Sequence, residues 1–197
     1  LKDRLYVEGT NSVTRRAAQT TIYRILEALT LLISPILAFT SDEIWRSMKH
    51  TSSVNADRAV YNDMPKVSGL AVEDGFVETW DKIHALRDNV QKALEEARNA
   101  KVIGASLEAK VTLFAKGETL DFIKANFDKL ADVFIVSAVE LKSEGEGSFK
   151  GSLEGVTVNV EKAGGHKCER CWKYSASIGS HPAHPTLCAR CASVVEA

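Results

Sequence analysis

The 197-residue chain lacks every sequence signal that would direct it into or across a membrane. It has no signal-peptide or transit-peptide pattern. Its most apolar run, Ile25 to Phe39, is interrupted by Glu27 and Pro35 and falls short of the roughly 18 uninterrupted apolar residues that a spanning helix needs. With 45% apolar and 26% charged residues, the composition is that of an ordinary folded protein. We therefore expect a soluble, cytoplasmic protein with no membrane partner.

Catalytic motifs are also missing from the sequence. It contains no glycine-rich phosphate-binding loop, no Gly-x-Ser-x-Gly nucleophile motif and no His-Glu-x-x-His metalloprotease motif. None of the five histidines has an obvious carboxylate or nucleophile companion. We therefore predict that this chain carries no catalytic residue of its own.

The net charge is only −1, but it is unevenly distributed. Residues 1–61 carry +2, residues 62–161 carry −6, and residues 162–197 carry +3, from five basic and two acidic side chains. A basic segment on a nearly neutral chain fits a polyanionic partner. It fits equally well with basic side chains that only offset the double negative charge of a zinc–tetrathiolate centre. The charge alone leaves both interpretations open.

Cysteine is scarce, and all four cysteines fall within one short segment, at Cys168, Cys171, Cys188 and Cys191. They form two Cys-x-x-Cys pairs separated by 16 residues, which is the pattern of a tetrahedral zinc site. The alternatives are two disulfides, inert buried thiols or a redox-active pair. Cytoplasmic thiols stay reduced, and a redox pair would leave the second pair unexplained. We predict one structural Zn²⁺ bound by these four thiolates.

Two histidines, His181 and His184, lie in the loop between the cysteine pairs and could be alternative ligands. Four cysteines already fill a tetrahedral site and leave no open position for a catalytic water. We therefore expect surface or supporting roles for both histidines.

Basic and aromatic residues cluster around the cysteine pairs, and we predict RNA contacts for Arg170, Trp172, Lys173 and Arg190. Arginine and lysine can bind phosphates, and an indole offers a face on which an unstacked base can lie. RNA is usually read in this way in single-stranded loops. For Trp172 a second role is equally plausible, because a small zinc module has almost no core and an aromatic residue beside a ligand commonly supplies one.

The remainder of the chain predicts an α+β protein in three parts. Residues 1–65 begin with a helix over 11–33 that Pro35 ends, followed by a second helix from Thr40 with a capping box at residues 40–43. Two apolar helices of this kind form part of a helical bundle. Residues 50–72 are polar and irregular, a linker or a short edge strand around residues 59–61.

Residues 66–163 form the second part, a small α/β domain with a long amphipathic helix over about 74–100 that Gly104 ends. Strands follow at about 107–115, 133–141 and 156–160, with a short helix over 120–130. Residues 164–197 are the third part, the zinc finger, which a hinge at Gly164-Gly165 joins to the domain before it.

Several segments together resemble the C-terminal region of bacterial isoleucyl-tRNA synthetases. The stretch from Pro35 to Trp45 also occurs in the related valyl and leucyl enzymes. Residues 103–109 and the terminal cysteine motif are what make the resemblance specific to the isoleucyl family. The segments that carry the resemblance are residues 15–19, 31–45, 103–109, 166–172 and 187–191.

The resemblance implies that the parent enzyme joins isoleucine to its tRNA with ATP, and that it is monomeric. Residues 1–65 would be the end of a helical anticodon-binding domain, and the zinc finger would help to hold the anticodon loop. The family's catalytic signatures and editing domain lie upstream and are not found in this sequence, which begins at Leu1 without an initiator methionine and so suggests part of a longer protein. ATP would therefore act only through the upstream catalytic domain, and no DNA partner is expected.

Two other interpretations compete with this one. Formamidopyrimidine-type DNA glycosylases end in a zinc finger with nearly the same cysteine spacing, but residues 39–45 are foreign to that family. The other alternative is a zinc module that binds protein, with Trp172 and Tyr174 as interface anchors. RNA binding should weaken steeply with salt, whereas an apolar interface should not.

Overall fold

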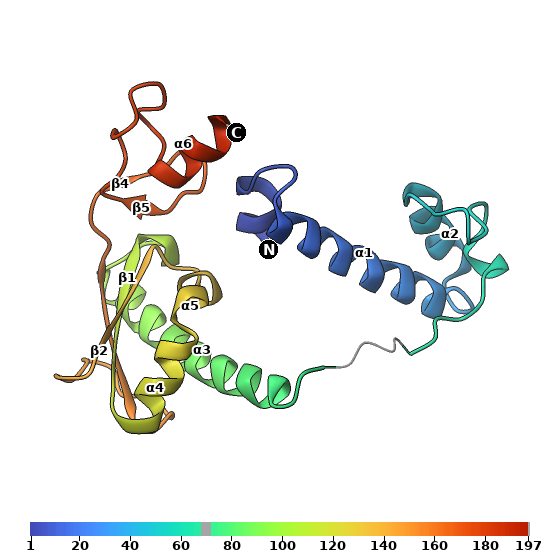
Figure 1. Cartoon of the computed structure of the whole chain (residues 1–197). Helices are drawn as coiled ribbons and strands as arrows, with labels where there is room; N and C mark the ends of the chain where they lie inside the picture. Colours follow the sequence, from blue (N-terminus) through green and yellow to red (C-terminus); the bar gives the residue numbers. More distant parts are fainter. Residues whose placement is uncertain (68–71, 197) are drawn as a thin grey trace. The chain divides into compact units, whose positions relative to one another are not determined.

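The computed structural model describes residues 1–67 and 72–196 and divides the chain into two compact units, Leu1–Ala71 and Val72–Ala197 (Figure 1). Among the described residues, no helix is both long and apolar enough to cross a membrane. The second unit contains both the predicted α/β domain and the predicted finger, so the three-part division at residues 65 and 163 stays a prediction. Gly69, in the predicted linker, lies outside the described residues.

The first unit is built on a long helix, α1 (Val13–Ile33), which follows a short π-helical segment, η1 (Asp3–Val7). The Ser12 hydroxyl accepts a hydrogen bond from the Arg15 amide at 3.2 Å and so caps the start of α1. The helix ends two residues before Pro35, which cannot continue it.

Helix α2 (Ala38–Ser47) begins two residues earlier than predicted, and the predicted capping box is wrong. The turn after α1 leads directly into it: the Leu37 amide donates to the Ile33 carbonyl at 2.8 Å, and the Leu37 carbonyl then accepts from the Ser41 amide at 2.9 Å. Thr40 therefore lies inside the first turn of α2, where its side chain has no capping role.

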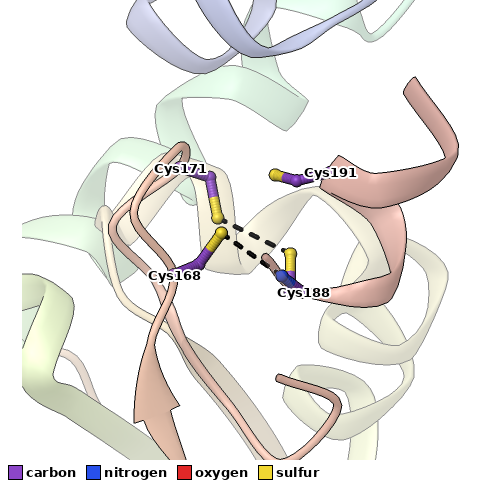
Figure 2. Close-up of side chains that lie close together, drawn as sticks. All are labelled: Cys168, Cys171, Cys188 and Cys191. Atoms are coloured by element: carbon purple, nitrogen blue, oxygen red, sulfur yellow. Dashed lines mark hydrogen bonds between the residues drawn. The ribbon is translucent and has the colours of Figure 1, made fainter. Parts of the chain in front are cut away.

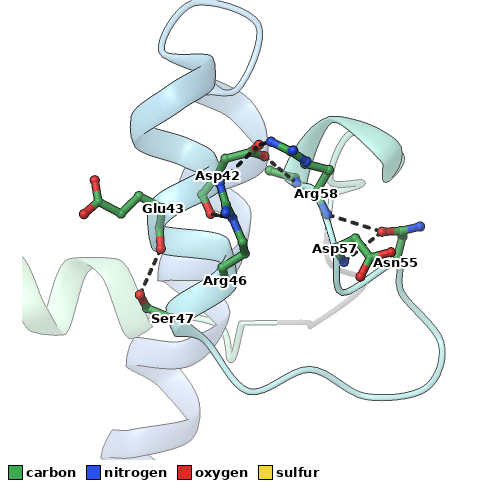
Figure 3. Close-up of polar contacts among 8 residues, drawn as sticks. Asp42, Glu43, Arg46, Ser47, Asn55, Asp57 and Arg58 are labelled. Carbon is green, nitrogen blue, oxygen red and sulfur yellow. Dashed lines mark hydrogen bonds and ion pairs between the residues drawn. The ribbon is translucent and has the colours of Figure 1, made fainter.

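The polar segment after α2 is held against that helix by Asp42, which is buried (Figure 3). Its carboxylate accepts hydrogen bonds from the Arg58 guanidinium and from the Ala59 amide, the latter at 3.1 Å. These bonds place residues 59–61 in a short 3₁₀ helix, η2 (Ala59–Tyr61), and the predicted edge strand is wrong. The Trp45 indole, completely buried, donates to the Asn55 carbonyl at 2.9 Å and completes the attachment.

The apolar stripe of α1 contributes little to the core of the first unit. A buried apolar cluster of this unit consists of Leu31, Trp45 and Ala59, and Val7 and Ala18 are also buried. Most of this stripe is 37–55% exposed, and its exposed members are Ile22, Ile25, Leu26, Leu29 and Leu32.

The second unit contains a three-stranded sheet in the order β2-β1-β3. The central strand β1 (Ala109–Ala115) runs parallel to β2 (Ala138–Lys142) and antiparallel to β3 (Val156–Lys162). Helices α4 (Gly117–Ala125) and α5 (Phe127–Phe134) connect β1 to β2, as a parallel pair requires. The long helix α3 (Phe76–Asn99) packs on the sheet, and a 3₁₀ turn, η3 (Ser106–Glu108), precedes β1.

Two predicted elements in this unit have the wrong bounds, for identifiable reasons. The predicted helix over 120–130 is two helices, and β2 begins at Ala138 because Leu130 and Phe134 are buried on α5, which continues to Phe134. The predicted end of the long helix near residue 100 is confirmed, since α3 ends at Asn99, but the helix stops before it reaches Gly104. Lys101 takes the left-handed conformation, with φ of 58°, and the Val102 amide returns to the Ala97 carbonyl at 2.9 Å.

A single apolar core joins α3, the sheet and the two connecting helices. On α3 the stripe is buried from Ile83 to Ala97, and Val111, Leu113 and Val158 meet it from the strands. The predicted α+β class is confirmed, with a long helix lying along the sheet (Figure 1).

Candidate metal centre and nucleic-acid interface

Residues 166–196 of the second unit fold around two cysteine pairs. Strands β4 (His166–Lys167) and β5 (Tyr174–Ser175) form an antiparallel hairpin, and its loop carries the first pair. Helix α6 (Ala189–Glu196) begins directly after Cys188 and carries Cys191 in its first turn. The hairpin and the helix thus each bring one pair of thiols to the same place.

The four sulfur atoms meet at one point of the structure (Figure 2). One Sγ atom from each of the four cysteines lies within 4.8 Å of the others, and the Sγ atoms of Cys171 and Cys188 are 3.8 Å apart. Cys168, Cys188 and Cys191 are buried, and Cys171 is half-buried. Four converging thiols in a buried setting match the donor set of a closed, structural zinc site.

The local electrostatics favour one thiolate over the others. Burial opposes ionisation of Cys168, but hydrogen bonds from the amides of Cys171, Cys188 and Arg170 outweigh it and lower the pKa of that thiol to about 6. Burial raises the pKa of Cys171 and of Cys191, and for Cys191 the neighbouring Cys188 thiol raises it further. Zinc binds thiolates, so loading the site must release protons, and acid must weaken binding.

The two loop histidines are directed to an acid and not to the cysteines. The His181 Nε2 atom lies 3.2 Å from a Glu196 carboxylate oxygen, and the His184 Nε2 atom lies 3.8 Å from the other oxygen. Their rings stack with centroids 5.6 Å apart. These contacts tie the loop to the end of α6, in agreement with the expected supporting roles.

The hairpin loop also fixes the position of Trp172. Its amide donates to the Cys168 carbonyl at 2.9 Å, and this tight turn places Trp172 in the left-handed region, with φ of 66°. A bulky residue rarely adopts this conformation, which glycine would adopt without strain. The indole N–H donates to the Glu169 carbonyl at 3.1 Å, and the Lys167 ammonium lies 5.7 Å from the ring centroid. The side chain is 45% exposed, which disfavours a core role.

The remaining predicted RNA contacts are in different surroundings. Arg170 and Arg190 are exposed, each directly before the second cysteine of its pair. Lys173 is half-buried, and its ammonium lies 2.6 Å from the Asp132 carboxylate on α5. Asp132 was not predicted to belong to the site, and no sequence signal could have placed it there because it is 41 residues away.

Comparison with known proteins identifies the family. Residues 1–113 match the family described as the anticodon-binding domain of tRNA ligase. The chain belongs to this family. A second match, over residues 165–194, is to a zinc finger described as found in FPG and IleRS. The family match continues past the first unit, through α3 and into β1.

Several isoleucine–tRNA ligases align with this family member over its whole length. It is 46% identical to the enzyme of Thermoanaerobacter sp. (strain X514) over 200 residues, covering 100% of this chain and 21% of the relative. Identity to the enzyme of Syntrophotalea carbinolica is 46% over 198 residues, and to that of Carboxydothermus hydrogenoformans 45% over 195 residues, each covering 99% of this chain and 21% of the relative. The chain spans about a fifth of the length of these relatives.

These findings confirm the zinc prediction and the resemblance. The finger is a structural zinc module, because its sequence matches a zinc-finger family and its four thiols converge. The glycosylase alternative is not favoured, because the same chain also matches an anticodon-binding domain.

Proposed function

We propose that this chain is the C-terminal, tRNA-binding region of an isoleucine–tRNA ligase. The observation that carries the proposal is the 46% identity to isoleucine–tRNA ligases along the entire chain, which includes the anticodon-binding match. The parent enzyme would join isoleucine to its tRNA with ATP in the cytoplasm, as a monomer and without a DNA partner. This region would position the tRNA and leave catalysis to other domains.

Within this function we assign zinc binding to Cys168, Cys171, Cys188 and Cys191. RNA contact is assigned to the exposed residues Arg170, Trp172 and Arg190. The strained backbone of Trp172 supports its assignment, since a tryptophan where glycine would fit better is expected when the indole has a task. Stacking against a base of the anticodon loop is that task.

A binding titration across a salt series tests the proposal. Isoleucine tRNA should bind the zinc-loaded chain more tightly than an unrelated tRNA, and affinity should fall steeply as salt rises. A chelator should abolish the preference. Equal, weak and chelator-insensitive binding of both tRNAs would mean that the chain is a scaffold whose recognition lies elsewhere, and binding that salt does not weaken would support the protein-interaction alternative.

The Trp172→Gly variant tests the base-stacking role. Glycine suits the left-handed φ of this position, so the zinc site should form normally. Loss of stacking should weaken binding of isoleucine tRNA by about 1–3 kcal/mol. Trp172→Phe is the matched control, because it keeps an aromatic face and should keep most of the affinity. Unchanged binding in the glycine variant would contradict the assignment.

A further inference from the structure

The zinc finger is attached to the α/β layer by two consecutive residues that follow the hairpin loop. The first is Lys173, whose ammonium lies 2.6 Å from the Asp132 Oδ1 atom on α5. The Lys173 side chain is only 20% exposed, so the ammonium is held against α5.

The second attachment is made by the backbone of Tyr174. Its amide donates to the Ser137 hydroxyl oxygen at 2.7 Å. The same hydroxyl donates to the Leu107 carbonyl, and the Ser137 amide donates to the Ala109 carbonyl at 3.1 Å. Ser137 therefore links β5 of the finger to the segment that enters the central strand β1.

The chain that enters the finger is also closely packed. Gly165 has φ of +82°, and a Cβ atom there would lie 2.3 Å from the Ser175 carbonyl carbon. Only glycine fits at residue 165, which lies directly before β4 and close to the backbone of Ser175 in β5. All four cysteines that would bind zinc lie within the finger, so the ion would order its interior, and the orientation of the finger on the α/β layer depends on contacts such as these.

We propose that Lys173 is a positioning residue, which with Asp132 and Ser137 fixes the orientation of the finger, and that it does not contact RNA. An ammonium held at a carboxylate and largely covered is poorly placed to meet a phosphate. Its neighbours Arg170 and Trp172 are exposed and would contact the RNA instead. This inference rests on the tRNA-binding function proposed above.

Exchanging the charges of Asp132 and Lys173 distinguishes a positioning role of Lys173 from direct contact with RNA. The variants are D132N, K173M and the double variant D132K/K173D, each confirmed to hold one zinc per chain. The matched control is D128N, which removes an exposed acid from the same helix. If Lys173 positions the finger, D132N and K173M should each weaken isoleucine-tRNA binding roughly two- to fivefold, the scale of one partly exposed ion pair. The double variant should recover most of the loss, and D128N should lose nothing.

The proposal is overturned if D132N binds as well as or better than the parent while K173M and the double variant bind poorly. That pattern would place Lys173 on the RNA. A second measurement needs no RNA: exchange of the Tyr174 amide hydrogen should become several-fold faster in both single variants and slow again in the double variant. If the parent chain binds no tRNA, the proposed function fails, and this exchange alone decides the positioning role. Unchanged exchange in both single variants would refute it.

Discussion

Helix α1 of the first unit and helix α3 of the second unit have similar lengths and a similar apolar periodicity but different surroundings. They contain 21 and 24 residues, and each repeats apolar side chains at helical spacing. On α3 the stripe from Leu86 to Ala97 is at most 9% exposed, because it packs into one core with the sheet, α4 and α5. On α1 the stripe from Ile22 to Leu32 is 37–55% exposed. A periodic stripe thus predicts a helix but does not identify what covers it.

The two units are consequently stabilised in different ways. The second unit combines a continuous apolar core with a zinc finger. The first unit has three buried apolar residues in its core cluster and relies on polar contacts around Asp42. Since apolar burial contributes most of the stability of a folded domain, perturbations should affect the two units unequally.

Removal of zinc should give the largest difference between the units. In small zinc modules the apparent binding energy is about 10–16 kcal/mol at neutral pH. A chelator, or Cys171→Ser, should therefore unfold residues 164–197, while the core of α3 and the sheet and the whole first unit stay folded. Residue-resolved hydrogen exchange would measure this. Acid should act in the same direction, because the ligand thiolates become protonated as the pH falls.

The matched control is a double variant, His181→Asn with His184→Asn. Both histidines pair with Glu196, so this variant should still hold one zinc per chain. Zinc loss in the control would make a histidine a ligand. Global unfolding of the Cys171→Ser variant would show that the predicted boundary between residues 163 and 164 is wrong.

Truncation of one leucine in each helix tests the burial difference directly. Leu94→Ala on α3 removes a completely buried side chain and should lower the free energy of unfolding by about 2–5 kcal/mol. Leu29→Ala on α1 removes a half-exposed one and should change it by less than about 0.5 kcal/mol. Urea denaturation of both variants provides the values. A similar loss in both would mean that another surface covers α1 in solution, and a concentration series would then detect self-association.

The smallest expected effect concerns the polar attachment in the first unit. The hydrogen bond from Arg58 holds the pKa of the Asp42 carboxyl below its usual range, helped by the Ala59 amide. A carboxylate with a lowered pKa stabilises the folded state fully above its ordinary value of about 4, and this contribution disappears as the pH falls toward the lowered value. Asp42→Asn should therefore destabilise the first unit at neutral pH and flatten its acid dependence.

Exchange of the Trp45 indole N–H, which is bonded to the Asn55 carbonyl, reports on this unit alone. Glu43→Gln removes the neighbouring charge as a control, and Figure 3 shows that side chain pointing away from Arg58. If both variants have the same pH dependence, the attachment through Asp42 does not contribute to stability.

Local sequence rules determined much of this protein. The spacing of Cys168, Cys171, Cys188 and Cys191 predicts the zinc site, because a tetrahedral ion needs four ligands and each Cys-x-x-Cys pair supplies two thiolates from one side. Helix α1 begins after Ser12 and ends before Pro35, and alternating apolar residues mark β1 and β3. These features can be read from the sequence because a helix cap, a proline ring and the alternation of side chains along a strand each involve only a few neighbouring residues.

Tertiary structure decided the rest, since the deciding contacts join residues far apart in the chain. Residues 59–61, predicted as a linker or a short edge strand, form a 3₁₀ helix bonded to Asp42, which lies 17 positions away from Ala59. Buried contacts of Leu130 and Phe134 extended α5 where a strand was expected. Asp132 contacts Lys173 from 41 positions away and suggests a role for that lysine that neither its charge nor its place two residues after Cys171 could indicate. Such partners depend on the whole fold, because only the folded chain brings them within bonding distance.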